Sequence, residues 1–383
     1  MIFKIFNRVE RVETCRNSTR STRSTRLNLV CALLFVSAFA ADGVTISDGM
    51  KWFDGRELPI EGRAFDNTEH YYDRLPSNVT TSVNSGVRSL KHDTSGMLFR
   101  FSTDSTNLVF KWVPYDSGLS MDHMPATGVS GIDVYRFDAA TGRWRYVTVG
   151  RITSASGATL SLDWTPGTPC LVNLPLYNGI RSFTLGVDPE ASVSPLPPRA
   201  SGIDKPVVFY GTSITQGGCA SRPGMSFVNI VGRDLDVPVV NLGFSGSGLM
   251  ELEMSEHLAA IDASCYVLDC VWNMRNMEVN TFTNRYETFI RNLRARRPDV
   301  PIVMAGMSDV YCDGPNDKEE CVRALYERLV AEGWAKLVHL PKDGMYSGDF
   351  EGTVDGTHAN NLGRRSLAKA YGTAVKSALN SSN

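Results

Sequence analysis

Three residues of this 383-residue chain have the types and spacing for acyl transfer: a serine, an aspartate and a histidine. Ser213 comes two residues after the apolar run 206–211, and Asp355 stands three residues before His358. A serine hydroxyl is a weak nucleophile, so a base must take its proton and a third group must fix the tautomer of that base. The pattern predicts Ser213 as the nucleophile, His358 as the base and Asp355 as the orienting carboxylate.

Acyl transfer also needs hydrogen-bond donors for the oxyanion of the tetrahedral intermediate, and each such donor contributes about 3 kcal/mol. Gly243 ends the apolar run 237–243, and Asn273 follows the run 265–271. We expect the backbone N–H groups of Ser213 and Gly243 and the side-chain amide of Asn273 to form this oxyanion hole.

The second half of the chain has a pattern that could bring these residues together. Near-continuous apolar runs alternate with stretches whose apolar residues recur every three or four positions, which predicts a parallel sheet with helices on both faces. The carboxyl ends of parallel strands meet at one edge, where ligands bind. We therefore expect a flavodoxin-like three-layer α/β/α domain over residues 204–383. The predicted strands are 206–211, 237–243, 265–271, 300–306 and 336–340, and the predicted helices are 227–234, 251–261, 283–297 and 318–332.

The first half has a different period. Short segments of alternating polar and apolar residues lie between turn-forming residues, which predicts an all-β, jelly-roll-like sandwich over residues 42–191 that serves as an accessory domain. The Pro-rich segment 192–203 is then expected to be an extended interdomain linker. The predicted strands are 97–103, 107–113, 131–138, 143–149 and 182–187, with a hairpin loop at 138–142.

Four segments at the predicted strand ends resemble the sequence blocks of the SGNH (GDSL-like) hydrolases. They are FYGTSITQGG, NLGFSGSG, VWNM and DGTH, in this order along the chain. The resemblance implies that Ser213, Gly243, Asn273 and His358 are the four residues that give the family its name, with Asp355 completing a triad. It covers the chain from about Pro206 to the C-terminus.

The match departs from the usual blocks at two positions. Thr212 stands where block I usually has aspartate, and Met274 follows Asn273 where block III more often has aspartate. The segment GTSIT nevertheless resembles a lipase/acylhydrolase-like subgroup. In that subgroup a β-rich domain with a Gly-x-Asp-Leu-Tyr signature precedes the hydrolase, and this chain has Gly131-Ile-Asp133-Val-Tyr135.

The N-terminus is predicted to be a secretory signal over residues 1–40. A basic run at 16–26 precedes the apolar stretch 27–39, which ends in Ala38-Phe39-Ala40, a small-x-small cleavage pattern. We expect a secreted or periplasmic protein with no stable membrane insertion after cleavage. A retained anchor is the alternative, and the length of the basic region leaves room for a start downstream of Met1.

Six of the eight cysteines remain after such cleavage, an even number that permits disulfides in an exported protein. Cys312 and Cys321 flank a polar loop and are the candidate pair. No CxxC motif or His-rich run gives a recognisable metal-ligand spacing, so neither a metal nor an organic cofactor is expected.

The net charge of −2 and the 21% of charged residues give no indication of a nucleic-acid partner. Arg222, just downstream of Ser213, is expected to line the mouth of the site and contact substrate. Secretion, the added β-domain and the lack of a long apolar lid favour a serine esterase that removes a short acyl group, acetyl, from a carbohydrate. The substrate is then a small-molecule or polysaccharide ester. A lipase or lysophospholipase and a non-catalytic sugar-binding protein are the alternatives, and the oligomeric state is left open.

Overall fold

The structure is a computed structural model that describes residues 43–308, 317–346, 349 and 351–381, all within one compact unit. The predicted signal segment and Cys312 lie outside the described residues, so signal cleavage and the Cys312–Cys321 disulfide stay predictions. The five described cysteines form no disulfide with one another. None of the described helices is long and apolar enough to cross a membrane.

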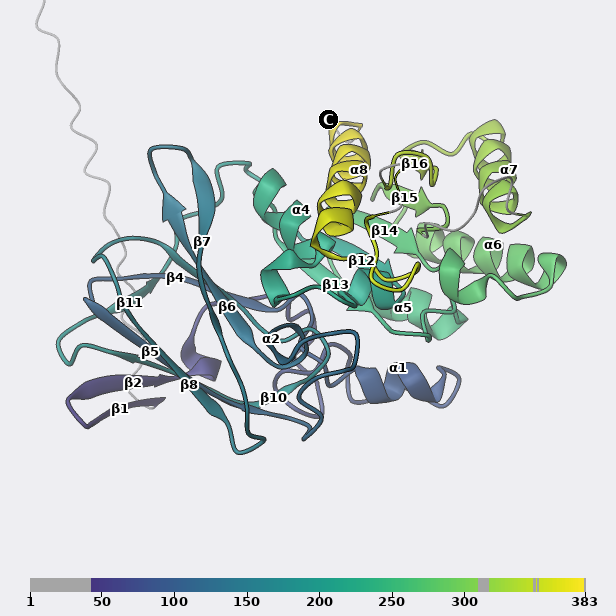
Figure 1. Ribbon diagram of the computed structural model, residues 1–383. Helices are drawn as coiled ribbons and strands as arrows, with labels where there is room; N and C mark the ends of the chain where they lie inside the picture. The colour runs from purple at the N-terminus through teal and green to yellow at the C-terminus, as the bar shows by residue number, and fades with distance from the viewer. Residues whose placement is uncertain (1–42, 309–316, 347–348, 350, 382–383) are drawn as a thin grey trace, which may run out of the picture. The chain divides into compact units, whose positions relative to one another are not determined.

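The first half forms two antiparallel sheets (Figure 1). All five predicted strands are present, and β6 and β7 pair across the predicted hairpin loop. The other strands have five residues or fewer, except β8, whose six residues alternate and were not recognised in the sequence. One sheet has the order β1 (Val44–Ser47), β2 (Met50–Asp54), β10 (Ile180–Val187), β5 (Asn107–Pro114) and β8 (Ala158–Asp163). The other has the order β11 (Val193–Pro195), β4 (Leu98–Thr103), β9 (Cys170–Asn173), β6 (Ile132–Asp138) and β7 (Arg143–Gly150), with β3 (Ile60–Glu61) also paired to β4.

Strand β11 lies inside the segment predicted to be a linker. Its residues Val193–Pro195 pair antiparallel with β4 at the edge of the second sheet. A proline at the end of an edge strand is tolerated because its missing N–H is not needed for a second partner strand. The predicted linker boundaries were therefore wrong at this point, and the connection to the second half begins after Pro195.

The second half contains the predicted five-stranded parallel sheet. Its order is β13–β12–β14–β15–β16, the order 2-1-3-4-5 of flavodoxin-like folds. The predicted fold class is confirmed. The strands are β12 (Val207–Gly211), β13 (Val239–Gly243), β14 (Cys265–Asp269), β15 (Ile302–Ala305) and β16 (Leu337–Leu340).

Helices cover both faces of this sheet (Figure 1). Side chains alternate along β12, so that Val208 and Tyr210 pack with one set of helices while Val207 and Phe209 pack with the other. The first face is covered by α5 (Leu252–Ala260), α6 (Val279–Arg296) and α7 (Asp317–Ala331), and the second by α4 (Phe227–Leu235) and α8 (Asn361–Asn380).

Several residues of the first half pack into the two hydrophobic cores that flank the parallel sheet. Leu75, Val83 and Val87, the last on α1 (Ser85–Leu90), are fully buried in the same cluster as Tyr210 on β12. Met124, Val129 and Leu176 likewise belong to the cluster on the other face. The first half has its own core between the two antiparallel sheets, but these further residues also complete the packing of the parallel sheet.

Candidate active site

Ser213 lies where the chain turns from β12 into the short helix α3 (Ser213–Gln216). Thr212 is the N-cap of this helix, and its hydroxyl accepts a hydrogen bond from the Ile214 N–H at 3.2 Å. Threonine and aspartate are both good N-caps. The departure at Thr212 therefore keeps the local role of the aspartate that block I usually has.

The structure brings Ser213, His358 and Asp355 into one hydrogen-bonded chain. His358 Nε2 lies 2.9 Å from Ser213 Oγ, and His358 Nδ1 lies 2.7 Å from Asp355 Oδ2. The other carboxylate oxygen, Oδ1, accepts the backbone N–H groups of Thr357 at 3.0 Å and His358 at 2.7 Å. This arrangement gives His358 the tautomer with its proton on Nδ1 and turns the Nε2 lone pair toward Ser213.

Asp355 stays ionised in this setting. Partial burial by itself would raise the pKa of Asp355, but hydrogen bonds from the His358 ring and from the backbone of His358 and Thr357 outweigh it and lower the pKa to about 2. A carboxylate that remains charged can stabilise an imidazolium on His358.

The loop that carries Asp355 and His358 is tied to the nucleophile turn by Arg364 on α8. This guanidinium is fully buried and donates to the carbonyl groups of Ile214, Gly218 and Ala359. One side chain thus bonds both the segment after Ser213 and the residue after His358. No sequence pattern indicated this role, because a helical arginine is usually exposed.

Gly243 does not present its N–H to the site, and its predicted role as an oxyanion donor is wrong in this geometry. That N–H donates to Asn241 Oδ1 at 2.9 Å. A Cβ on Gly243 would lie 2.2 Å from the Gln216 backbone nitrogen. The glycine is needed for the close approach of β13 to α3.

The free donor on this loop is Gly246. The N–H groups of Phe244, Ser245, Ser247 and Gly248 all bond protein acceptors, whereas that of Gly246 has no acceptor among the described residues. Its φ of +66° suits a glycine. The Ser213 N–H, at the first position of α3, also lacks an acceptor in the described part of the chain.

Asn273 braces the same loop from η4 (Val271–Met274), which follows β14. Its carboxamide is assigned with Oδ1 accepting from the Ser247 and Gly248 N–H groups, both at 3.0 Å, because the opposite orientation would place the amide nitrogen against these donors. In this orientation the Nδ2 group faces acceptor positions. Met274 is fully buried in the core and anchors η4 where the family more often has aspartate.

Arg222 does not line the mouth of the site, contrary to the prediction. Its guanidinium forms an ion pair with the fully buried Asp133, Nη1 to Oδ2 at 2.6 Å, and lies 3.9 Å from the centroid of the Tyr146 ring. Asp133 Oδ2 also accepts the Gly224 N–H at 2.9 Å. The Gly-x-Asp-x-Tyr segment on β6 therefore holds the segment after the nucleophile, and Tyr135 takes part by donating to the Gly224 carbonyl at 3.4 Å.

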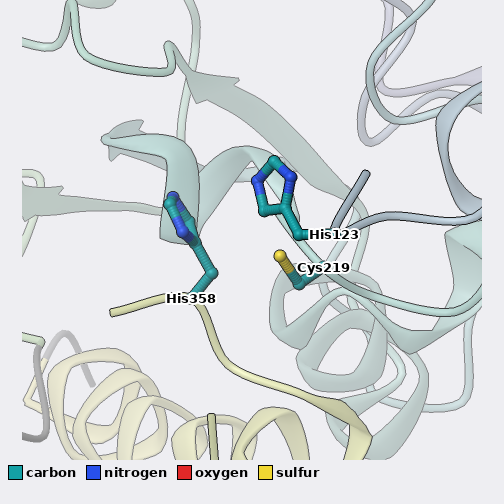
Figure 2. A group of neighbouring side chains, drawn as sticks. All are labelled: His123, Cys219 and His358. Carbon is teal, nitrogen blue, oxygen red and sulfur yellow. The ribbon is translucent and has the colours of Figure 1, made fainter. Parts of the chain in front are cut away.

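The first half also reaches the site directly. The Tyr177 hydroxyl donates to the Ser213 carbonyl at 3.0 Å. A tight hairpin, Met121–Met124, places the ring of His123 with its centroid 5.6 Å from that of His358 (Figure 2). Sequence reasoning missed both residues because it confined the chemistry to the second half.

Cys219 lies beside these two histidines (Figure 2). Burial raises the pKa of its thiol to about 11. At neutral pH it is therefore a thiol rather than a competing nucleophile.

A buried polar network holds the loop that follows β13. Gln216 Nε2 donates to Asp93 at 2.8 Å, and Gln216 Oε1 accepts the Ser245 N–H at 2.9 Å. Arg74, also fully buried, donates to the Gly243 carbonyl at 2.6 Å. Asp93 and Arg74 both come from the first half of the chain, so this half positions the loop that carries Gly246.

A cavity with a volume of about 460 Å³ lies beside the site. A larger cavity of about 760 Å³, with Glu253, His257 and Arg285 in its wall, contains none of the site residues. The smaller cavity includes Cys219, which belongs to the group around His358, whereas the larger cavity shares no residue with that group. The lining residues of the smaller cavity are Cys219, Ser221, Glu351, Asn360, Asn361 and Leu362.

Comparison with known proteins was made for sequence families and for solved structures. Residues 204–376 match the GDSL-like lipase/acylhydrolase family, and residues 50–193 match the N-terminus of SGNH-hydrolase-type esterases. A GDSL-like lipase from Bacteroides ovatus is similar in structure, with 28% identity, a TM-score of 0.76, and coverage of 86% of this chain and 98% of that one. No curated protein matches the chain.

Two more distant structures share the fold alone. The salicylyl-acyltransferase SsfX3 has 17% identity and a TM-score of 0.72, with coverage of 87% of this chain and 98% of that one. A family two carbohydrate esterase from Clostridium thermocellum has 14% identity and a TM-score of 0.55, with coverage of 75% of this chain and 94% of that one. The two family matches show that residues 204–376 belong to the GDSL-like lipase/acylhydrolase family and that residues 50–193 form the N-terminal domain found in SGNH-hydrolase-type esterases.

Proposed function

We propose that this protein is an exported serine esterase that removes short acyl groups, acetyl above all, from carbohydrates. The observation that carries the proposal is the hydrogen-bonded chain from Ser213 Oγ through the His358 ring to Asp355. Membership of an esterase/acylhydrolase family gives the reaction class. The acyl group, the acceptor and export are the proposed part.

In the proposed mechanism Ser213 Oγ attacks the ester carbonyl carbon while its proton passes to His358 Nε2. The Ser213 and Gly246 N–H groups and the Asn273 amide stabilise the oxyanion. The tetrahedral intermediate collapses, the C–O bond to the alcohol breaks, and His358 returns the proton to the leaving alkoxide. Water then attacks the acyl-enzyme, with His358 again as the base, and Ser213 is regenerated.

The lining of the cavity beside the site supports a polar alcohol as the acceptor. The cavity beside the site has four polar side chains, those of Ser221, Glu351, Asn360 and Asn361, which suit hydroxyl groups better than an alkyl chain. In addition, the carbohydrate esterases from Clostridium thermocellum and Cellvibrio japonicus share the two-part fold, although this likeness alone carries no substrate.

The test compares acyl chain lengths and acceptors. We expect the purified protein to hydrolyse p-nitrophenyl acetate with a kcat/KM at least ten times that on the octanoate, and to release acetate from acetylated xylan or mannan. Ser213→Ala should lose this activity and no longer react with a fluorophosphonate, whereas the exposed control Ser154→Ala should keep both. A faster rate on octanoyl esters would replace the proposal by a lipase-like activity. Absence of fluorophosphonate labelling at Ser213 would overturn the esterase proposal.

A further inference from the structure

Three potential metal ligands from distant segments lie close together at the active site, and one of them is the proposed base. One ligand atom from each of His123, Cys219 and His358 lies within 4.8 Å of the other two, and Figure 2 shows the three side chains side by side. We propose that these residues bind a divalent transition-metal ion, preferentially Zn²⁺, and that the bound ion inhibits ester hydrolysis. Donors at positions 123, 219 and 358 have no recognisable spacing, which is why the sequence predicted no metal.

Both histidines already have their second ring nitrogen engaged by a carboxylate. His123 Nδ1 lies 2.8 Å from Asp122 Oδ1, and His358 Nδ1 lies 2.7 Å from Asp355 Oδ2. Each carboxylate favours the tautomer that carries its proton on Nδ1 and leaves the Nε2 lone pair available. Metal-binding histidines commonly have this carboxylate partner.

Two imidazole nitrogens and one sulfur suit Zn²⁺ in tetrahedral coordination, with the fourth position left to water. Bonds of about 2.0 Å to nitrogen and about 2.3 Å to sulfur require ligand atoms roughly 3.3–3.6 Å apart. Because the donors lie within 4.8 Å of one another, they must close by at most about 1.5 Å. The His123 side chain, which is 35% exposed, can make this movement by rotation. The Cys219 backbone is linked to the same hairpin, since its N–H donates to Met124 Sδ at 3.4 Å.

Binding involves no redox change. A Zn–S bond forms as the Cys219 thiol proton passes to the buffer, and both histidines bind as neutral imidazoles. The lone pair on His358 Nε2 now holds the ion, so it can no longer accept the proton of Ser213 Oγ, which lies 2.9 Å away. The inhibition rests on the proposed function, whereas metal binding rests only on the three donors.

Metal binding is tested first, without reference to activity. Co²⁺ is added to the chelator-treated full protein, and thiolate-to-cobalt charge transfer is followed in the near ultraviolet. The band is expected in the wild type and in Ser213→Ala, but not in Cys219→Ser, and it should weaken strongly in His123→Ala. The matched control is His92→Ala, which removes a histidine from the separate cluster Glu69–Asp73–His92 and should keep the band. Absence of the band in the wild type would overturn the proposal.

Inhibition is tested by Zn²⁺ titration of ester hydrolysis in thiol-free buffer. Each variant is compared with its own zinc-free rate. The half-inhibiting concentration should rise by on the order of 100-fold in Cys219→Ser and about 10-fold in Asp122→Asn, and a chelator should restore the wild-type rate. Equal inhibition of the wild type and both variants would sink the proposed site. If Co²⁺ binds as expected but no variant hydrolyses esters, the proposed function fails and the metal site stands.

Discussion

Asp133 and Arg222 form the central ion pair between the two halves of the molecule, with 2.6 Å between Oδ2 and Nη1. The aspartate side chain is fully buried and that of the arginine is 17% exposed. The same carboxylate accepts the Gly224 N–H and, through Oδ1, the Asn173 side chain at 2.8 Å. All its strong partners are therefore intramolecular, and the pair fixes the segment that follows the nucleophile.

Asp133→Asn is expected to lower the free energy of unfolding by about 3 kcal/mol, because it leaves the mostly buried Arg222 without its counter-charge. The matched control is Asp138→Asn on the same strand, which breaks an exposed pair with Arg145 and should cost less than about 1 kcal/mol. Urea unfolding of the two variants measures the difference. Equal losses would show that the Asp133 pair carries no special share of the stability.

Alanine substitutions of Gly243 and Gly246 should differ in their effect on folding and stability. Gly243→Ala places a Cβ 2.2 Å from the Gln216 nitrogen, so we expect poor folding and a low yield of soluble protein. A Cβ at Gly246 meets nothing within 4 Å, and only the left-handed φ is penalised, at about 1 kcal/mol. Thermal unfolding compares the two. A well-folded Gly243→Ala variant with normal stability would contradict the close approach described for β13 and α3.

Asn273→Ala should reduce kcat by on the order of 10²–10³ with little change in KM, because its Nδ2 is proposed to act in the transition state rather than in substrate binding. Steady-state kinetics on an acetyl ester measures this. Asn280→Ala, on the exposed start of α6, is the control and should behave as the wild type. A rise in KM with unchanged kcat would assign Asn273 to substrate binding.

Asp355→Asn should lower kcat by on the order of 10²–10⁴, because an amide at this position favours the wrong tautomer of His358. Asp355→Asn should also alter the pH dependence of the free energy of unfolding. Because the pKa of Asp355 is about 2 in the folded state and 3.8 for an unperturbed aspartate, the carboxylate stabilises the folded state above pH 3.8, and this contribution is lost as the pH falls toward 2. The stability difference between wild type and variant should therefore narrow over that window. A constant difference would argue against the strong hydrogen bonds described here.

Asp93 should have the opposite effect on the pH dependence of stability. Burial raises the pKa of Asp93 to about 7, so the folded state binds more protons than the unfolded state between about pH 4 and 7. The free energy of unfolding should fall as the pH rises through this window and then level off. Asp93→Asn should flatten this decline. The control is Asp188→Asn, because hydrogen bonds from Asn107 and Thr106 lower the pKa of Asp188 to about 2 and its contribution is lost only in acid. If the free energy of unfolding of Asp93→Asn fell with pH as in the wild type, another group would be responsible for the decline.

The parallel sheet could be predicted because its strands are near-continuous apolar runs, and residues at their carboxyl ends must meet. This reasoning placed Ser213 and His358 together correctly. It could not assign the oxyanion glycine, since the choice between Gly243 and Gly246 depends on which N–H the Asn241 side chain accepts. Arg222 was wrongly predicted to contact substrate, because its ion-pair partner could not be identified from nearby sequence. Its partner Asp133 lies 89 residues away in the other half of the chain.

The packing of first-half side chains against the parallel sheet limits how the two halves can be separated or exchanged. If the chain were divided after β11, the parallel sheet would lose Leu75, Val83 and Val87 from one face and Met124, Val129 and Leu176 from the other. We expect a hydrolase half made alone to aggregate through these uncovered surfaces. An exchange of N-terminal halves between relatives could succeed only if the incoming half supplied matching apolar side chains, a carboxylate for Arg222 and a guanidinium in place of Arg74.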